Sequence, residues 1–319
     1  MANFVIMYSN DAPTPLHLKR LAGAGAGVGV AVADSEEAAV ALAGDADAFL
    51  GHRYLRQALP HASRLRWVQS TAAGTGHLPG AELRARGIEL TRCPIFADTV
   101  ALHAVALALA LVRGLPESLR LQAAGQWGPR PATLPWPETA MIVGLGLVGQ
   151  AVARRLQPLV SRLIGVRRQP GPGDRLVDEV YDPSTWRQAL GRTDLCVLAV
   201  SASPGNCHLV DEDVLCAMPP HAVLVNVGQG ISVDQDALER TLRAGHLGGA
   251  ALDVLDPVPV DPGSSFWSTP RLLITPKNAV FTPDRQATLE RFIEEQVFRF
   301  LSGAPLLHVV RPWPMRGAD

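Results

Sequence analysis

The sequence lacks the features that would direct it to a nucleic acid or a membrane. Its 29 lysines and arginines balance 30 aspartates and glutamates, for a formal net charge of -1. Such a balance provides no large positive field for attracting DNA, RNA or anionic lipid. The longest apolar run, residues 99–112, is interrupted by His103 and is shorter than the roughly 20 residues that cross a bilayer. We therefore expect no nucleic-acid partner and no membrane association.

The sequence is also poor in cysteine and has no targeting signal. Cys93, Cys196, Cys207 and Cys216 form no C-x-x-C pair and no metal-type spacing, so we expect small buried thiols and no metal site. Residues 1–10 have no basic flank before an apolar segment and no small-residue cleavage site. We interpret them as a first strand and expect a cytoplasmic protein.

The first part of the chain alternates short apolar runs with helical stretches. With 319 residues and 47% apolar composition, the chain can bury the cores of about two domains. The expected strands of the first domain are residues 4–8, 48–50, 65–69 and 88–91. From Asp98, an expected N-cap, residues 100–113 carry Ala and Leu on nearly every face. This pattern predicts a helix that is covered all round.

A second series of strands follows the connection at residues 125–137, which is rich in Gly and Pro. The expected strands are 139–143, 163–166, 195–200, 223–227, 250–254 and 272–275, with a helix over 149–156. This alternation predicts a doubly wound parallel sheet. An amphipathic helix at about 284–301 ends the series, and we expect the apolar tail at 306–310 to return to the first domain.

A glycine turn lies in the middle of the sequence, where the strand 139–143 runs directly into a helix. Gly144 permits a tight turn, Gly146 removes the Cβ that would strike a pyrophosphate, and Gly149 lets the helix pack close to the strand. The free N–H groups at the helix N-terminus, around Leu147 and Val148, then meet the phosphates. The turn with its flanking elements predicts a dinucleotide site.

The end of the next strand reads Gly165-Val166-Arg167-Arg168, where NAD-binding sites usually carry a carboxylate for the ribose hydroxyls. An acid there would repel a 2′-phosphate, whereas the guanidinium groups of Arg167 and Arg168 can bind it through charge-assisted hydrogen bonds. The sequence therefore favours NADP over NAD. The alternative is that the two arginines form a solvated basic loop.

Several further segments resemble the D-isomer-specific 2-hydroxyacid dehydrogenases, including the NADP-using glyoxylate/hydroxypyruvate reductases. The likeness covers nearly the whole chain, and its carriers are residues 72–76, 100–103, 144–149, 224–227, 245–254, 274–276 and 303–306. It implies an α/β fold in which a Rossmann-type doubly wound domain, residues 98–284, is inserted into a smaller flavodoxin-like catalytic domain, residues 1–97 and 285–319. It also implies an active site in the cleft and a homodimer built around the dinucleotide-binding domains.

The resemblance also implies roles for individual residues. Asp253 falls where the family binds the nicotinamide carboxamide, Ser201 and Pro204 fall near the adenosine, and Val227 belongs to the cofactor-binding set. The substrate loop corresponds to Ala73, Gly74, Thr75 and Gly76. Thr75 and the backbone N–H groups of that turn are available to bind a polar substrate group.

This sequence departs from the family at all three catalytic positions. The pattern N-x-x-R-G reads Asn226 to Gly230 with Gln229 in place of the Arg; E-P-E-P reads Asp256 to Pro259 with Val258 in place of the Glu; and T-P-H ends in Lys277 in place of the His. The changes are coherent, because the Glu serves only to tune a His that is absent here.

These departures leave a different set of candidate catalytic residues. Gln229 can donate neutral hydrogen bonds but cannot pair bidentately with a carboxylate, or it is a purely structural amide. Lys277 can protonate a developing alkoxide or amine if it is partly buried beside the nicotinamide, or it is a surface lysine. His103 and His77 are reserve proton donors or histidines satisfied in a core or interface.

Three functions are compatible with this sequence. The first is an NADPH-dependent reductase of a small carbonyl or imine with altered acid chemistry. The second is a sensor or scaffold protein that kept the dinucleotide cleft and lost the catalytic residues. The third is an enzyme that holds its cofactor permanently for a redox-neutral reaction such as an elimination.

Overall fold

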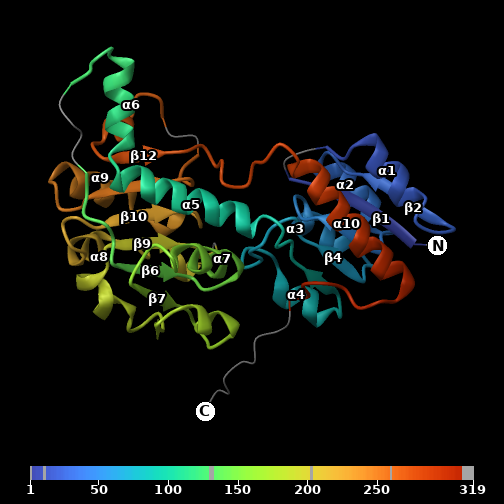
Figure 1. Cartoon of the computed structure of the whole chain (residues 1–319). Helices are drawn as coiled ribbons and strands as arrows, with labels where there is room; N and C mark the ends of the chain where they lie inside the picture. The colour runs from blue at the N-terminus through green and yellow to red at the C-terminus, as the bar shows by residue number, and fades with distance from the viewer. Residues whose placement is uncertain (1, 10–11, 129–132, 202–203, 259–260, 311–319) are drawn as a thin grey trace. The chain divides into compact units, whose positions relative to one another are not determined.

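The computed structural model describes residues 2–9, 12–128, 133–201, 204–258 and 261–310, and it divides into two compact units. Unit 1 comprises Met1–Phe96 and Thr282–Asp319, and unit 2 comprises Ala97–Phe281. The chain thus leaves unit 1 once, forms all of unit 2, and returns (Figure 1). These divisions fall close to the boundaries expected from the sequence, after residues 97 and 284.

Unit 1 is built on a parallel sheet of five strands in the order β2-β1-β3-β4-β5. The strands are β1 (Ala2–Met7), β2 (Val28–Val32), β3 (Ala48–Gly51), β4 (Trp67–Gln69) and β5 (Glu89–Thr91). This order is that of the flavodoxin-like sheet. The sequence pattern does not predict β2, because this edge strand is at most half-buried and carries no buried residue.

Helices cover both faces of this sheet (Figure 1). They are α1 (Pro15–Ala22), α2 (Glu36–Ala43), α3 (Leu55–Ala58), η1 (Leu59–His61), α4 (Gly80–Ala85) and α10 (Arg285–Ser302). Val5 and Met7 belong to the core that includes residues of α2 and α3. Phe300 of α10 packs on the opposite face, with its ring centroid 5.8 Å from that of Phe4 and 5.2 Å from that of Trp67.

The end of the described chain returns to unit 1, as the sequence predicted. Val309 forms an antiparallel bridge with Thr91, and the Val310 N–H donates to the Leu90 carbonyl at 2.7 Å. The side chain of Gln296 in α10 holds this tail, because it both donates to and accepts from the backbone of Leu307. Residues 307–310 therefore join unit 1 at the edge strand β5 and at α10.

Unit 2 contains a parallel sheet of seven strands in the order β12-β11-β10-β9-β6-β7-β8. The strands are β6 (Thr139–Val143), β7 (Arg162–Val166), β8 (Glu179–Tyr181), β9 (Leu195–Leu198), β10 (Val223–Asn226), β11 (Gly249–Leu252) and β12 (Leu272–Ile274). This is the doubly wound Rossmann order with one added strand, so the predicted fold class is confirmed. The sequence pattern missed β8, a short edge strand in which Val180 is exposed.

The helices of unit 2 lie on both faces of its sheet. They are α5 (Ala97–Val112), α6 (Leu115–Ala123), α7 (Leu147–Leu156), η2 (Pro172–Leu176), η3 (Trp186–Arg192), η4 (Pro204–Asn206), α8 (Glu212–Ala217), η5 (Gly230–Ser232), α9 (Gln235–Arg243) and η6 (Ser265–Ser268). Strand alternation divides the core: Ala140 and Ile142 pack with α5 and α7, whereas Met141 and Val143 pack with α8 and α9. Every strand of the sheet's centre is therefore buried on both sides.

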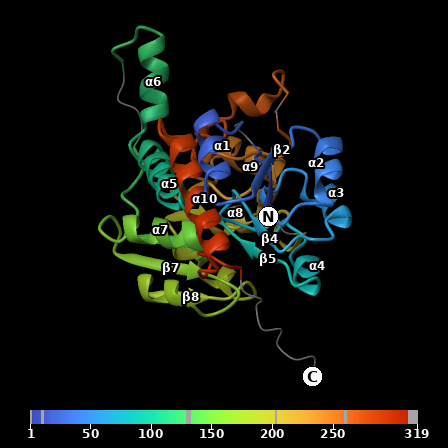
Figure 2. The same cartoon turned by 90° about the vertical axis from the view of Figure 1, so that its right-hand side faces the viewer.

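Helix α5 differs from its prediction in two ways. It begins at Ala97, so Asp98 lies in its first turn and pairs with Arg155 of α7 at 2.7 Å instead of capping the helix. It is also not covered all round, because Leu102 is 61% exposed. No single described helix is long and apolar enough to cross a membrane; α5 and α6 meet that criterion only together, and they are bent by 70° (Figure 2).

Candidate cofactor and substrate sites

The glycine turn has the geometry that its sequence predicts. Gly144 has φ +105°, and a Cβ there would lie 2.8 Å from the Ala199 carbonyl oxygen. A Cβ on Gly149 would lie 1.9 Å from the Gly144 oxygen, so α7 packs directly against the end of β6. A Cβ on Gly146 would meet nothing within 4 Å among the described residues. The turn is therefore closed on the protein side and open where a pyrophosphate would approach.

The start of α7 is available for an anion. Gly146 occupies the N-cap, and no side chain within the described ranges caps the helix. The N–H groups of Leu147, Val148 and Gly149 consequently have no intrahelical partner, and the positive end of the helix dipole lies there. This open cradle fits the diphosphate of a dinucleotide.

The sheet places the remaining cofactor candidates at the same edge as this turn. The strand order reverses between β6 and β9, which is where α/β sheets of this kind bind ligands. Val227 follows β10 and is 8% exposed, and the half-buried Ser201 follows β9, with its carbonyl accepting from Asn206. Pro204 begins η4, and its side chain lies outside the described part of the chain.

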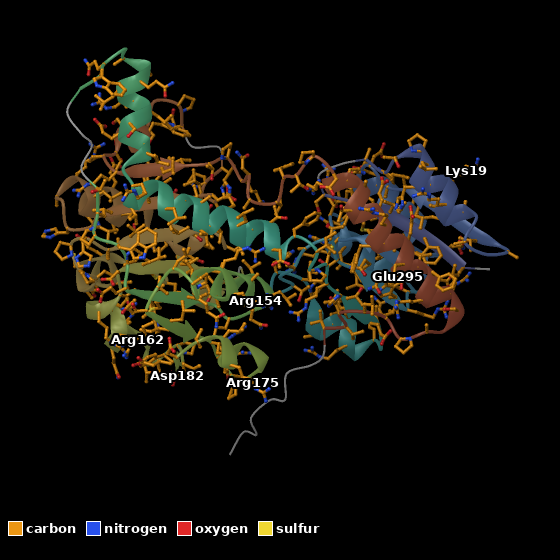
Figure 3. All side chains as sticks on the ribbon, in the orientation of Figure 1. Lys19, Arg154, Arg162, Arg175, Asp182 and Glu295 are labelled. Atoms are coloured by element: carbon orange, nitrogen blue, oxygen red, sulfur yellow. The ribbon has the colours of Figure 1, made fainter. Side chains whose placement is uncertain are left out.

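The two arginines that follow β7 are not equivalent. Arg167 donates to Asp174 at 2.9 Å, and the same carboxylate accepts from the Gly171 N–H. The Arg167 side chain is 15% exposed, so it is committed to its own loop. Arg168 is exposed and has no ionic partner among the residues described. Arg175, labelled in Figure 3, is a further exposed arginine in η2.

Asp253, directly after β11, is 3% exposed and lies at the centre of a hydrogen-bond network. Its Oδ1 accepts from Thr275 Oγ1 and the Asn278 N–H, both at 2.7 Å, and lies 3.2 Å from Nε2 of His103. Its Oδ2 accepts from the Ala279 N–H at 3.1 Å. Burial raises the pKa of this carboxyl, but the hydrogen bonds together hold the pKa below its usual value. Oδ2 can accept one more hydrogen bond, as a carboxamide site requires.

We expect Asp253→Asn to destabilise the protein by on the order of 1–3 kcal/mol, because the amide would direct a donor at a buried N–H or hydroxyl group. Denaturant unfolding of unit 2 measures the loss. Because the folded-state pKa of Asp253 is lowered, the ionised carboxylate stabilises the folded protein at pH values above the unfolded-state pKa. This stabilisation is lost as the pH falls through the folded-state pKa. Asp213→Asn, at an exposed position in α8, is the matched control and should change little. Equal stability of the two variants would contradict the network's role.

His103 is held within this network. Its Nε2 lies 3.0 Å from Thr275 Oγ1, which itself donates to Asp253. His103 therefore links α5 to the ends of β11 and β12. His103 and Asp253 both belong to unit 2. Through this contact α5, the first helix of the unit, holds the Asp253 carboxylate in position.

Gln229 lies in a tightly fixed loop after β10. Nδ2 of Asn226 donates to the Gln229 carbonyl at 2.9 Å, and Oδ1 of Asn226 accepts from the Gly228 N–H. A Cβ on Gly230 would lie 2.1 Å from the Leu255 carbonyl carbon, so the loop packs directly against the backbone that follows β11. The Gln229 side chain is exposed on this rigid base. Val258 is 73% exposed, and Pro259 lies outside the described residues.

Lys277 follows β12 in a left-handed conformation, with φ +56°. Its N–H donates to the Asp253 carbonyl at 2.9 Å, so the backbone is fixed to the end of β11. Its side chain is exposed, so the partial burial that was expected to favour proton donation is not found. A lysine in this conformation is uncommon and is found where the surroundings impose it, often at functional sites. Lys277, Gln229 and Asp253 thus all lie at the carboxyl end of the unit 2 sheet.

The predicted substrate loop, Ala73 to Gly76, follows β4 in unit 1. The preceding Ala72 carbonyl accepts from the Cys93 N–H at 2.9 Å, and the Thr75 carbonyl accepts from the Leu78 N–H at 3.1 Å. Ala73, Gly74 and Thr75 are half-buried and Gly76 is exposed. Beside the loop, His77 lies edge to face with His52, their ring centroids 5.2 Å apart.

His52 is the residue of this region that the sequence analysis did not single out. It directly follows β3, and its Nδ1 lies 3.2 Å from Ser70 Oγ. The signal in the sequence is a polar residue placed directly after a buried strand, Ala48–Gly51. Of the four cysteines, Cys93 and Cys196 are buried as expected, whereas Cys207 and Cys216 are exposed. Among the described residues, no group of three or more His, Cys, Asp or Glu side chains is arranged to hold a metal ion.

The fold and the glycine turn define a dinucleotide-binding α/β protein of two domains. The family model for the NAD-binding domain of D-isomer specific 2-hydroxyacid dehydrogenases matches residues 105–279. Human glyoxylate reductase/hydroxypyruvate reductase is 32% identical over 251 residues, which cover 76% of this chain and 76% of that protein. The glyoxylate reductase of Pyrococcus furiosus is 28% identical over 275 residues, covering 81% and 80%.

A solved structure gives the same result. The NADPH-dependent glyoxylate/hydroxypyruvate reductase of Sinorhizobium meliloti, in complex with NADP and malonate, superposes with a TM-score of 0.80 at 25% identity and covers 97% of this chain and 96% of that chain. The chain belongs to the D-isomer specific 2-hydroxyacid dehydrogenase family. It is an NAD(P)-dependent oxidoreductase.

Proposed function

We propose that this protein is an NADPH-dependent reductase of a small carbonyl or imine compound. The observation that carries the proposal is the glycine turn, closed behind Gly144 and Gly149 and open at Gly146, at the reversal point of a doubly wound sheet. Exposed Lys277 and Gln229 at the same sheet edge are the groups that could act on a substrate. Family membership supports the reaction class, and the replaced residues argue for a substrate other than a simple 2-hydroxy acid.

Each candidate site residue of unit 2 has a distinct role in the proposed reaction. When bound, NADPH supplies the hydride. The N–H groups at the start of α7 bind the diphosphate, and Oδ2 of Asp253 accepts from the carboxamide. Gln229 orients the substrate with a neutral hydrogen bond, and Lys277 donates a proton to the oxygen or nitrogen that gains charge as the hydride arrives. In unit 1, the loop Ala73 to Gly76 binds the substrate.

The test is oxidation of NADPH, followed by its absorbance, with a panel of small carbonyls and imines that includes glyoxylate and hydroxypyruvate. We expect sustained turnover with at least one member. The panel separates this function from a dinucleotide-dependent sensor or scaffold, which the loss of the family's catalytic Arg, Glu and His also allows. A sensor would bind NADPH and turn over none of the compounds. Dinucleotide that co-purifies with the protein would favour the redox-neutral enzyme.

We propose NADPH as the preferred cofactor, with Arg168 as the group that binds the 2′-phosphate. Arg168→Ala should weaken NADPH binding about tenfold or more, the effect of one charge-assisted interaction, and leave NADH binding unchanged. Arg167→Ala should have the smaller effect, because Arg167 is already paired with Asp174. Calorimetry with each nucleotide measures both. Arg154→Ala, an exposed arginine of α7 (Figure 3), is the control; equal loss for NADH and NADPH would contradict the proposal.

We also propose a homodimer formed through unit 2. Helix α6 has no buried residue, and Leu115 and Leu119, one turn apart, are 50% and 63% exposed. Trp127, just beyond the helix, is fully exposed. Such a cluster of large apolar side chains is typical of a protein interface. Leu119→Glu should convert dimer to monomer in light scattering, whereas Phe298→Glu, 62% exposed in unit 1, should not. A monomeric wild-type protein would contradict the assignment.

A further inference from the structure

His52 lies beside the predicted substrate loop because two neighbouring strands end together. Strands β3 and β4 are parallel and adjacent, with Leu50 opposite Gln69. His52 follows the first strand, and Ser70 and Thr71 follow the second. In open α/β sheets this carboxyl edge is where ligands bind. The residue is therefore in a position to meet whatever the loop binds.

Hydrogen bonds fix which nitrogen of the His52 ring carries the proton. Nδ1 lies 3.4 Å from the Thr71 N–H nitrogen and 3.2 Å from Ser70 Oγ. A backbone N–H can only donate, so Nδ1 accepts and the proton resides on Nε2. The Ser70 hydroxyl accepts from the Ala72 N–H at 3.1 Å and is free to donate to the ring. The imidazole is thus locked to the start of the substrate loop.

The second nitrogen of the ring is unused. Nε2 of His52 has no hydrogen-bond partner within the described ranges, although the residue is half-buried and its ring contacts that of His77. Burial first, and the neighbouring His77 second, lower the pKa of His52 to about 4. The side chain is therefore a neutral N–H donor at physiological pH and not an acid.

We propose that Nε2–H of His52 recognises the substrate by donating a hydrogen bond to one of its carbonyl or hydroxyl oxygens. The inference rests on the proposed reductase function and names a specificity group for it. Nε2 is not among the fully buried polar atoms of the described residues, so water can reach it, and a substrate oxygen can take the place of that water. A neutral donor of this kind suits a neutral carbonyl or hydroxyl oxygen and does not form the guanidinium–carboxylate pairing that the family's arginine provides.

Two amide substitutions test the roles of the two ring nitrogens of His52 separately. The amide of His52→Asn can reach the Nδ1 position and accept from Thr71, but it leaves the Nε2 position empty. The amide of His52→Gln reaches the Nε2 position and keeps a donor there. We expect His52→Asn to raise the KM for the panel carbonyl that is reduced fastest about tenfold or more. We expect His52→Gln to change it about threefold or less, with NADPH affinity unchanged in both variants.

The reverse pattern, rescue by Asn and failure of Gln, would show that His52 only anchors the loop through Nδ1 and would overturn the proposal. Nitrogen-15 NMR of the ring provides a readout that needs no turnover. We expect a proton on Nε2 and a shift of that resonance when dihydroxyacetone, a neutral hydroxyketone, is added to the NADP⁺-saturated protein. A proton on Nδ1, or an Nε2 resonance that dihydroxyacetone leaves unmoved, overturns the proposal. If the resonance moves but no carbonyl oxidises NADPH, the reductase function fails while substrate recognition by His52 stands.

Discussion

Replacing Gly146 with valine is expected to weaken NADPH binding by at least about 100-fold, a loss of roughly 3 kcal/mol. The position has φ -75° and ψ -161°, a conformation that any residue adopts, and a Cβ there would meet no described atom within 4 Å. The substitution should therefore leave the fold intact. The valine side chain would occupy the space that the diphosphate needs to reach the N–H groups of α7. Calorimetric titration of NADPH measures the effect.

Gly149→Ala is the informative comparison, because it changes the same turn from the protein side. Its Cβ would lie 1.9 Å from the Gly144 carbonyl oxygen, so β6 and α7 would have to separate. We expect this variant to lose stability by about 1–3 kcal/mol in denaturant unfolding. Gly146→Val should unfold like the wild-type protein. NADPH affinity that survives in Gly146→Val would rule out diphosphate binding at this turn.

Replacing Lys277 with alanine is expected to lower kcat by about 100-fold or more, the usual contribution of a positioned proton donor. The Lys277 backbone is fixed by its bond to the Asp253 carbonyl, and lysine and alanine are equally disfavoured at φ +56°. The substitution should therefore remove the ammonium group without changing backbone strain. We expect NADPH affinity to remain nearly unchanged, because no cofactor contact is assigned to this side chain.

Lys277→Arg distinguishes proton donation from electrostatic attraction. Arginine keeps the positive charge but does not give up a proton in proteins. If Lys277 is the proton donor, kcat should stay low in Lys277→Arg. Recovery of kcat in that variant would assign Lys277 a purely electrostatic role, and full activity in Lys277→Ala would remove it from the mechanism.

The elements of both units were predictable to the extent that their hydrophobic patterns are strong. Strand β6 has the predicted bounds, because its residues are buried on both faces and a glycine ends it. Edge strands β2 and β8 were missed, because half-exposed strands have no continuous apolar run. Helix α5 was predicted as fully covered from its Ala and Leu content alone, whereas Leu102 is exposed. Composition indicates that a face is apolar but does not indicate what covers it.

Glycine positions and strand periodicity are local properties of the chain, and they were sufficient to predict the cofactor turn and the family's fold. The use of the charged groups depends instead on contacts between segments that the fold brings together. Arg167 and Arg168 are adjacent in sequence, yet a carboxylate seven residues away pairs with one and leaves the other exposed. His52 and Thr71 are 19 residues apart and meet because β3 and β4 are neighbours. Contacts across strands depend on how the sheet is assembled, and no local pattern specifies them.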